Sequence, residues 1–300
     1  MSLAHGTEPA FSPARLITAS SPLQWSALFL VVAAVAYASG VLRLRRRGDR
    51  WPARRTLAFV VGGLGAVAIA LLSGLAAYDD TLFSAHMVQH MILIMIAPIF
   101  LALGAPITLA LRTLPGRPRR AVLAVLHSRV AAVATFPLVG FALFTLSSYA
   151  LYFTGIYEAT LRNSLLHEFV HVHFLVVGCL FFWPLLGLDP VPGRIAYPFR
   201  ALLMFASMPF HAILGLTVMQ SRHVLAGNYY AEAAPRLDHL ADQGVGGGLL
   251  WASGDLVALL MLGVLLVQWM RASEREAQRE DRRLDRLEAL EAQEAASAES

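Results

Sequence analysis

Lysine is absent from this 300-residue sequence, and cysteine occurs once, at Cys179. A single cysteine excludes a disulfide framework and a zinc or iron–sulfur site built from several thiolates. Charge is also scarce, since charged residues make up 15% of the chain against about 25% in a typical soluble protein. Hydrophobic residues reach 57%, where about 45–50% is usual. The composition predicts an integral membrane protein, with a lipid bilayer and no nucleic acid among its partners.

Seven stretches of the sequence are long and apolar enough to cross a bilayer as helices, which takes about 20 residues each. None alternates polar and apolar residues with a period of two, so membrane-spanning strands are not expected. The sequence predicts an all-α, seven-helix membrane bundle with spans at 23–42, 56–78, 82–103, 130–153, 165–188, 201–219 and 249–270. The third apolar run continues to Leu111, and Pro98 with Gly104-Ala105-Pro106 is expected to kink it or turn its end along the membrane surface.

The placement of arginine predicts the orientation. Twenty of the 24 arginines follow the first, third and seventh spans or flank the connection between the fifth and sixth; the other four are Arg15, Arg162, Arg222 and Arg236. Because basic loops stay in the cytoplasm, the N-terminus is predicted outside and the C-terminus inside. The expected organisation is an extracytoplasmic segment at 1–22 without a cleaved signal peptide, the seven-span domain at 23–270 and a charged cytoplasmic tail at 271–300. The tail is expected to be a solvated helix and not a docking helix, although it carries a short stripe of Leu284, Leu287 and Leu290.

Histidines gather on one side of this topology. His86 and His90 begin the third span, and His167 and His171 begin the fifth. A separation of four residues puts two imidazoles about 40° apart around a helix and one turn apart, so both reach one point. On this topology only His127 faces the cytoplasm; the other nine histidines are His5, His86, His90, His167, His171, His173, His211, His223 and His239. Ionisable groups inside a membrane mark function, so the two matched pairs predict a shared metal or proton role.

Further donors accompany these pairs. Met87 and Met91 lie on an adjacent face of the third span, His211 lies on the sixth, and Asp255 is the one acid within the seventh. His173 falls on roughly the opposite helix face from the second pair, which favours a supporting or packing role. Methionine at helical spacing is more often packing than a ligand. Thioether together with imidazole nevertheless suits copper, especially Cu(I). The residues therefore predict a soft-metal site near the outer leaflet.

One stretch of the third span resembles a known family. The run His86-Met87-Val88-Gln89-His90-Met91, followed by Ala97-Pro98 and Gly104-Ala105-Pro106, is similar to the signature of the multi-helix CtaG-type assembly factors of caa-type cytochrome c oxidases. Three further stretches are similar to the family: His167-Glu168 with His171-Val172-His173-Phe174, Met208-Pro209 with His211, and Asp242-Gln243 through the glycines to Trp251. The resemblance covers about residues 20–270. It departs at Asp255, where the family pattern leads us to expect a glutamate.

The resemblance implies a membrane-bound metal chaperone that helps to mature a haem–copper oxidase, in the bacterial plasma membrane and with oxidase subunits as partners. Combined with the spacing, it predicts a copper site, with Cu(I) as the expected ion and His86, His90, His167 and His171 as primary ligands. His211 and either Met87 or Met91 would be auxiliary ligands. Asp255 and His173 would support the ligands from outside, Asp255 by orienting one or carrying a proton.

Other readings of the same residues remain open. A membrane b-type haem protein would hold haem between His90 and His171. A copper or proton transporter would need a polar path across the whole membrane, whereas the inner halves of these spans are almost wholly apolar. A scaffold could bind the oxidase without any metal. No enzymatic activity is expected, because the sequence has no serine or cysteine triad, and the glycines at 244–248 are expected to form a flexible approach to Trp251 and Asp255 and not a phosphate loop.

Overall fold

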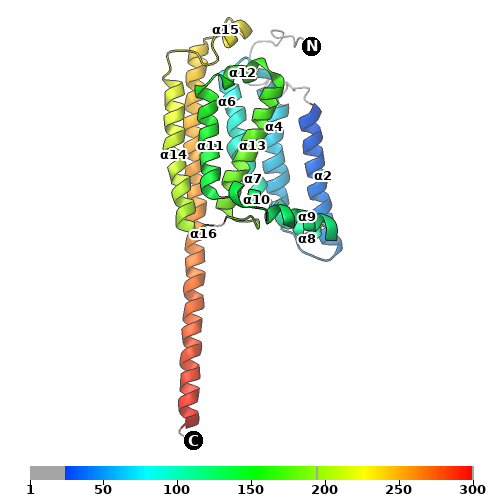
Figure 1. Cartoon of the computed structure of the whole chain (residues 1–300), viewed down its shortest axis with the longest axis vertical. Coiled ribbons are helices and arrows are strands. Elements are labelled where there is room, and N and C mark those ends of the chain that lie inside the picture. The colour runs from blue at the N-terminus through cyan, green and yellow to red at the C-terminus, as the bar shows by residue number, and fades with distance from the viewer. Residues whose placement is uncertain (1–23, 194, 299–300) are drawn as a thin grey trace.

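The computed structural model describes residues 24–193 and 195–298, and every regular element in those ranges is a helix (Figure 1). The expected N-terminal segment 1–22, with His5 and Arg15, lies outside the described residues, as do Arg194 and residues 299–300. Six helices of the described chain are long and apolar enough to cross a membrane, or seven if one pair of helices bent by 73° is a single span. The all-α, multi-span membrane fold is therefore confirmed. The orientation of the termini stays a prediction.

The bundle is built from spans that are each one helix or a short series of helices. The first span is α2 (Gln24–Arg46). The second joins α3 (Ala53–Leu57), π-helical η1 (Ala58–Leu64), α4 (Gly65–Leu72) and α5 (Gly74–Tyr78), and the third joins α6 (Phe83–Met91), π-helical η2 (Ile92–Ile96) and α7 (Ala97–Leu103). The remaining helices of the described chain, spanning or not, are α8 (Pro106–Thr113), α9 (Gly116–Leu126), α10 (Arg129–Ala134), α11 (Pro137–Phe153), α12 (Ile156–Arg162), α13 (Ser164–Leu186), α14 (Tyr197–Met219), α15 (Tyr229–Ala233) and α16 (His239–Ala298).

The two ends of the bundle carry different residues. Helices α8, α9 and α10 lie at one end with the loop after α2, the start of α14 and the projecting part of α16 (Figure 1). We call this the arginine end. Helices α12 and α15 lie at the opposite end, where α6, α13 and α16 begin (Figure 1). Within the described residues its only arginines are Arg162, Arg222 and Arg236, and we call it the histidine end.

The predicted turn after the third span is confirmed. Ala105 adopts a left-handed backbone conformation with φ 48°, and Pro106 starts α8, which lies across the arginine end (Figure 1). Asp189 anchors that helix by accepting hydrogen bonds at Oδ1 from the Thr108 amide at 2.7 Å and the Thr108 hydroxyl at 2.6 Å. The apolar run to Leu111 is therefore interrupted at Ala105, although the helices from Phe83 to Thr113 still count together as one candidate span.

The fourth span is shorter than predicted. The apolar stretch 130–153 contains a break, with α10 ending at Ala134 and α11 starting at Pro137. Phe136 is extended, with ψ 123°, because a residue that precedes proline is pushed out of the helical region. The span thus begins at Pro137, and α12 follows α11 at a bend of 73°.

The expectation that the glycines at 244–248 are flexible was wrong, because they lie inside α16. A Cβ on Gly247 would fall 2.5 Å from the Met219 amide nitrogen, and one on Gly215 would fall 2.7 Å from the Gly247 carbonyl oxygen. Small residues let membrane helices approach this closely, so the glycines serve the packing of α14 on α16. The same helix continues past Met270, without a break, into the charged tail (Figure 1).

A second close approach sets the position of α13. A Cβ on Gly178 would lie 2.1 Å from the Ile94 carbonyl oxygen and 2.6 Å from the ring of Pro98. Only glycine allows α13 to lie this near to η2 and α7. The contact holds the histidine-bearing starts of α6 and α13 beside each other.

Candidate metal centre

The structure brings the two histidine pairs together. His86 and His90 on α6 face His167 and His171 on α13, and we call these four residues the histidine cluster. Ring centroids lie 4.1 Å apart for His86 and His90, 4.3 Å for His167 and His171, and 5.1 Å for His86 and His167. One ligand nitrogen from each of His86, His90 and His167 lies within 4.8 Å of the other two. Three nitrogen donors from two membrane helices thus surround one point.

The cluster is buried, and much of its hydrogen-bonding capacity is unused. His86, His90 and His171 are 0%, 1% and 4% exposed. Among the described residues, five buried ring nitrogens of the cluster have no hydrogen-bond partner: Nδ1 and Nε2 of His86, Nε2 of His90, Nε2 of His167 and Nδ1 of His171. A buried polar group left without a partner costs about 1–3 kcal/mol. Such a concentration of unpaired nitrogens is what a cation site leaves when only the protein's own hydrogen bonds are counted.

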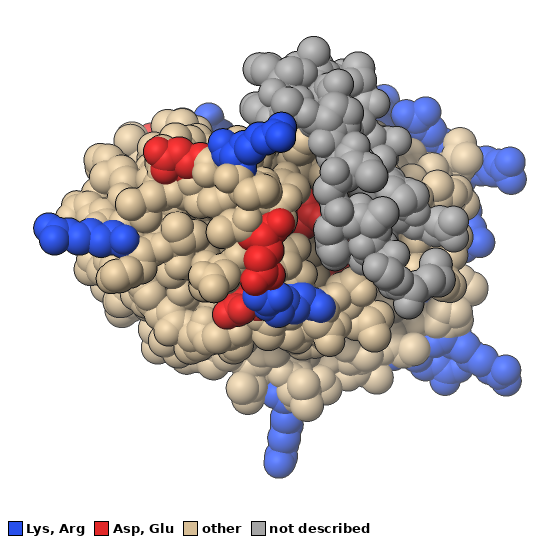
Figure 2. Space-filling model, turned by 90° about the horizontal axis from the view of Figure 1, so that it is seen from above, with Lys and Arg blue, Asp and Glu red and all other residues tan. Residues whose placement is uncertain are grey.

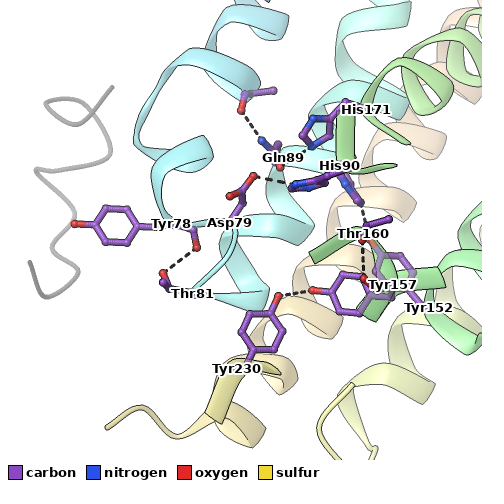
Figure 3. A network of polar contacts seen from close by, with 12 residues as sticks. Tyr78, Asp79, Thr81, Gln89, His90, Tyr152, Tyr157, Thr160, His171 and Tyr230 are labelled. Carbon is purple, nitrogen blue, oxygen red and sulfur yellow. Dashed lines mark hydrogen bonds and ion pairs between the residues drawn. The ribbon is translucent and has the colours of Figure 1, made fainter. Parts of the chain in front are cut away.

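Gln89 fixes the orientation of one of these rings (Figure 3). Its Nε2 donates to the Ala70 carbonyl at 3.0 Å, so its Oε1 is left to accept from His171 Nε2 at 3.1 Å. His171 therefore carries its proton on Nε2 and presents a free lone pair at Nδ1. The carbonyl of Ala70 lies beside the break between α4 and α5 at Ser73, where the regular helical pattern is interrupted.

Tyrosines close the cluster from the histidine end. The Tyr152 hydroxyl on α11 lies 2.9 Å from His90 Nδ1, and the Tyr157 ring on α12 lies 5.0 Å from His86. The Tyr157 hydroxyl hydrogen-bonds to the hydroxyl of Tyr230 on α15 (Figure 3). All three tyrosines are nearly fully buried. Helices α11, α12 and α15 therefore form the wall that separates the cluster from the surface.

Asp79 is a donor that the sequence pattern marked only weakly. It lies in the turn between α5 and α6, is 8% exposed, and places Oδ2 3.9 Å from His167 Nε2. Burial, and then the neighbouring Asp80, raises the pKa of this carboxyl well above its usual value. Ligand atoms of Asp79, His167 and His171 lie within 4.8 Å of one another. An acid in the turn before the His86/His90 pair was the available signal, but nothing in the sequence predicted its burial.

His211, predicted as an auxiliary ligand, and Asp255, predicted as a supporting residue, fall outside the two donor groupings. His211 on α14 has Nδ1 3.0 Å from the Ser207 carbonyl oxygen, and a Cβ on Gly254 would lie 2.9 Å from its Cδ2. Asp255 accepts a hydrogen bond from Trp251 Nε1 at 2.9 Å and interacts electrostatically with His211. Neither residue belongs to a grouping of three or more donors in the described chain. The structure thus places His211 and Asp255 together between α14 and α16.

The remaining predicted residues also have other surroundings. His173 Nε2 lies 2.8 Å from the Ser147 hydroxyl on α11, on the other side of α13 from the cluster, as its spacing suggested. Met87 is fully buried in the main hydrophobic core. Met91 and Met95 line an apolar cavity of about 240 Å³ between α6–η2 and α16.

Acidic side chains gather near the middle of the surface over the histidine end (Figure 2). The elements at this end contribute Asp80, Glu158, Glu168, Glu232, Asp238 and Asp242. Arg162 offsets part of this charge by pairing with Glu158 at 2.9 Å and Glu232 at 3.5 Å. A predominantly acidic face attracts cations and raises their local concentration.

Comparison with known proteins gives relatives over most of the chain. Uncharacterized proteins of Mycobacterium bovis and Mycobacterium tuberculosis are each 42% identical over 264 residues, and one of Mycobacterium leprae is 38% identical over 265. The alignments cover 85% of this chain but 40% of each relative, so the chain spans about two fifths of the curated relatives it matches. No solved structure matches. The family described as cytochrome c oxidase caa3 assembly factor matches residues 35–272, which include the whole histidine cluster.

Proposed function

This chain belongs to the family of cytochrome c oxidase caa3 assembly factors, and on that premise we propose that it binds copper in the histidine cluster and delivers it to a haem–copper oxidase. The observation that carries the proposal is the set of five buried imidazole nitrogens that have no hydrogen-bond partner in the described chain. The copper is cargo and not a resident cofactor. The partners are subunits of the oxidase, and the site of action is the bacterial plasma membrane.

The donor set fits Cu(I). Neutral imidazoles are good ligands for this ion, and burial from water favours the neutral, metal-binding form of histidine. Bonds from imidazole nitrogen to a small metal ion are about 2.0–2.1 Å long, so nitrogens within 4.8 Å of one another need to close by roughly 1 Å. Met87 stays a predicted auxiliary ligand, although it packs in the main hydrophobic core.

The protein's own residues prepare the cluster for the ion. Gln89 holds His171 through the hydrogen bond to Nε2. Tyr152 can accept the Nδ1 proton of His90, which leaves Nε2 free to bind. Partners of this kind fix the tautomer and direction of metal-binding histidines. The wall of buried tyrosines excludes water, and an ion bound behind it is protected from other ligands.

The compactness of the cluster favours an ion over haem. Centroids of His90 and His171, the pair first considered for haem, lie 5.6 Å apart with the rings at 81°, and Phe174 lies 4.8 Å from His90. A porphyrin between two axial histidines requires space for the whole macrocycle. A visible spectrum of the purified protein separates the readings, since a haem protein shows a Soret band.

Copper binding by the full chain in detergent tests the proposal. We expect about one Cu(I) per chain in competition with bicinchoninate, and loss of that binding in His86→Ala/His90→Ala. His223→Ala is the matched control, because His223 is an exposed histidine of the same end. Stoichiometric copper in the double variant would refute the site. In cells the double variant should assemble little active oxidase and recover partly with added copper; normal assembly would favour a scaffold without metal.

A further inference from the structure

The donors around the cluster form two groupings that share one histidine. His86, His90 and His167 make the first, and Asp79, His167 and His171 make the second, each with its ligand atoms within 4.8 Å of one another. His167 is the common member. The five residues therefore describe two adjacent positions for a cation, and an ion can move between them while keeping its bond to His167.

The two positions differ in their access to the surface. His86 and His90 are 0% and 1% exposed. Asp79 and His171, the members that belong only to the second position, are 8% and 4% exposed, and Asp79 lies in the turn at the histidine end. A cation that arrives from the acidic face meets the carboxylate grouping first. The three-histidine grouping lies behind it.

The turn that carries Asp79 is firmly held. The Tyr78 carbonyl accepts hydrogen bonds from the Leu82 amide at 2.8 Å, the Thr81 amide at 3.1 Å and the Thr81 hydroxyl at 3.2 Å (Figure 3). Asp79 therefore reaches His167 from a fixed backbone.

We propose that Asp79, His167 and His171 form a transient second copper position, through which the ion enters and leaves the three-histidine position. This inference rests on the proposed function. On the way out, Cu(I) keeps the His167 nitrogen, releases the nitrogens of His86 and His90, and gains the His171 nitrogen and an Asp79 oxygen. Asp79 binds as a carboxylate and releases to water any proton it carried. Copper remains Cu(I), so no oxidant or reductant is needed.

A transient position changes the rate of exchange and leaves the equilibrium affinity alone. Full-length protein loaded with Cu(I) is mixed with excess bicinchoninate, and copper release is followed by absorbance. We expect Asp79→Asn to slow release about tenfold with an unchanged dissociation constant. Asp80→Asn, which removes the same charge one residue away, should release copper at the wild-type rate, and Asp79→Glu should restore most of the speed.

The outcomes separate the two proposals. Equal release from wild type and Asp79→Asn would overturn the transient position while leaving the copper site intact. Equal slowing by Asp79→Asn and Asp80→Asn would also overturn it, because the effect would then be one of surface charge. Loss of equilibrium binding in a folded Asp79→Asn would make Asp79 a resident ligand, again against the proposal. Wild-type protein that binds no copper would refute both.

Discussion

The histidine cluster and His211 both place buried imidazoles inside membrane helices, yet their ring nitrogens differ in hydrogen bonding. His86 has no hydrogen-bond partner at either nitrogen within the described chain, whereas His211 is paired at Nδ1 with the Ser207 carbonyl. Four rings converge in the first place, and His211 packs against Phe144 and the backbone position of Gly254 in the second. Burial of a histidine alone thus does not mark a metal site. The convergence of four rings with unused lone pairs is what supports the proposed copper site.

The largest effect is expected for His167→Ala, because His167 belongs to both donor groupings. Loss of a direct ligand should weaken Cu(I) binding by more than the roughly 10–100-fold that follows loss of an outer partner. Competition with bicinchoninate measures the change. A copper affinity equal to that of the wild type would show that His167 is not a ligand and that it resembles an ordinary buried histidine such as His211.

A smaller effect is expected for Gln89→Leu, which keeps the volume but removes the acceptor for His171 Nε2. Because His171 belongs to the transient position, release of Cu(I) to bicinchoninate should slow by less than about tenfold, at an unchanged dissociation constant. Gln89→Glu keeps an acceptor oxygen and should recover part of the speed. If both variants release copper at the wild-type rate, Gln89 acts only through its hydrogen bond to the Ala70 carbonyl.

The opposite result is expected for His211→Ala. Copper affinity should stay at the wild-type value, while the protein should lose about 1–3 kcal/mol of stability, because a buried hydrogen bond and its packing disappear. Thermal unfolding in detergent, with and without Cu(I), measures both quantities. A lower Cu(I) affinity in this variant would instead support the auxiliary ligand role predicted from the sequence. His211 would then not differ from the cluster in function.

The smallest effect is expected for Met91→Leu. Met91 lines the apolar cavity between α6–η2 and α16, and leucine is a tolerated replacement of similar volume. Cu(I) affinity should not change. X-ray absorption of the loaded protein provides a second measurement, and a copper–sulfur distance that Met91→Leu removes would show that the thioether is a ligand after all.

Much of the architecture follows from local pattern. Apolar stretches of about 20 residues predict the spans, and Gly104-Ala105-Pro106 predicts the turn into α8. The misplaced start of the fourth span has an equally local cause, since Pro137 breaks an apolar run that composition alone joins. The glycines of α16 were misread for a different reason. Their role is defined by contacts with Met219 and Gly215 on another helix. A rule that considers only nearby residues in the sequence cannot predict those contacts.

A spacing of four residues is nearly one helical turn, so the order of residues alone predicts that His86 and His90 share a helix face, as do His167 and His171. That the two faces meet is evident only from the packing of the helices in space. That meeting depends on how closely α13 approaches η2 at Gly178, and on a turn that buries Asp79 beside His167. Spacing along one helix is set by backbone geometry, whereas distance between helices is set by the side chains that both helices bring to the contact.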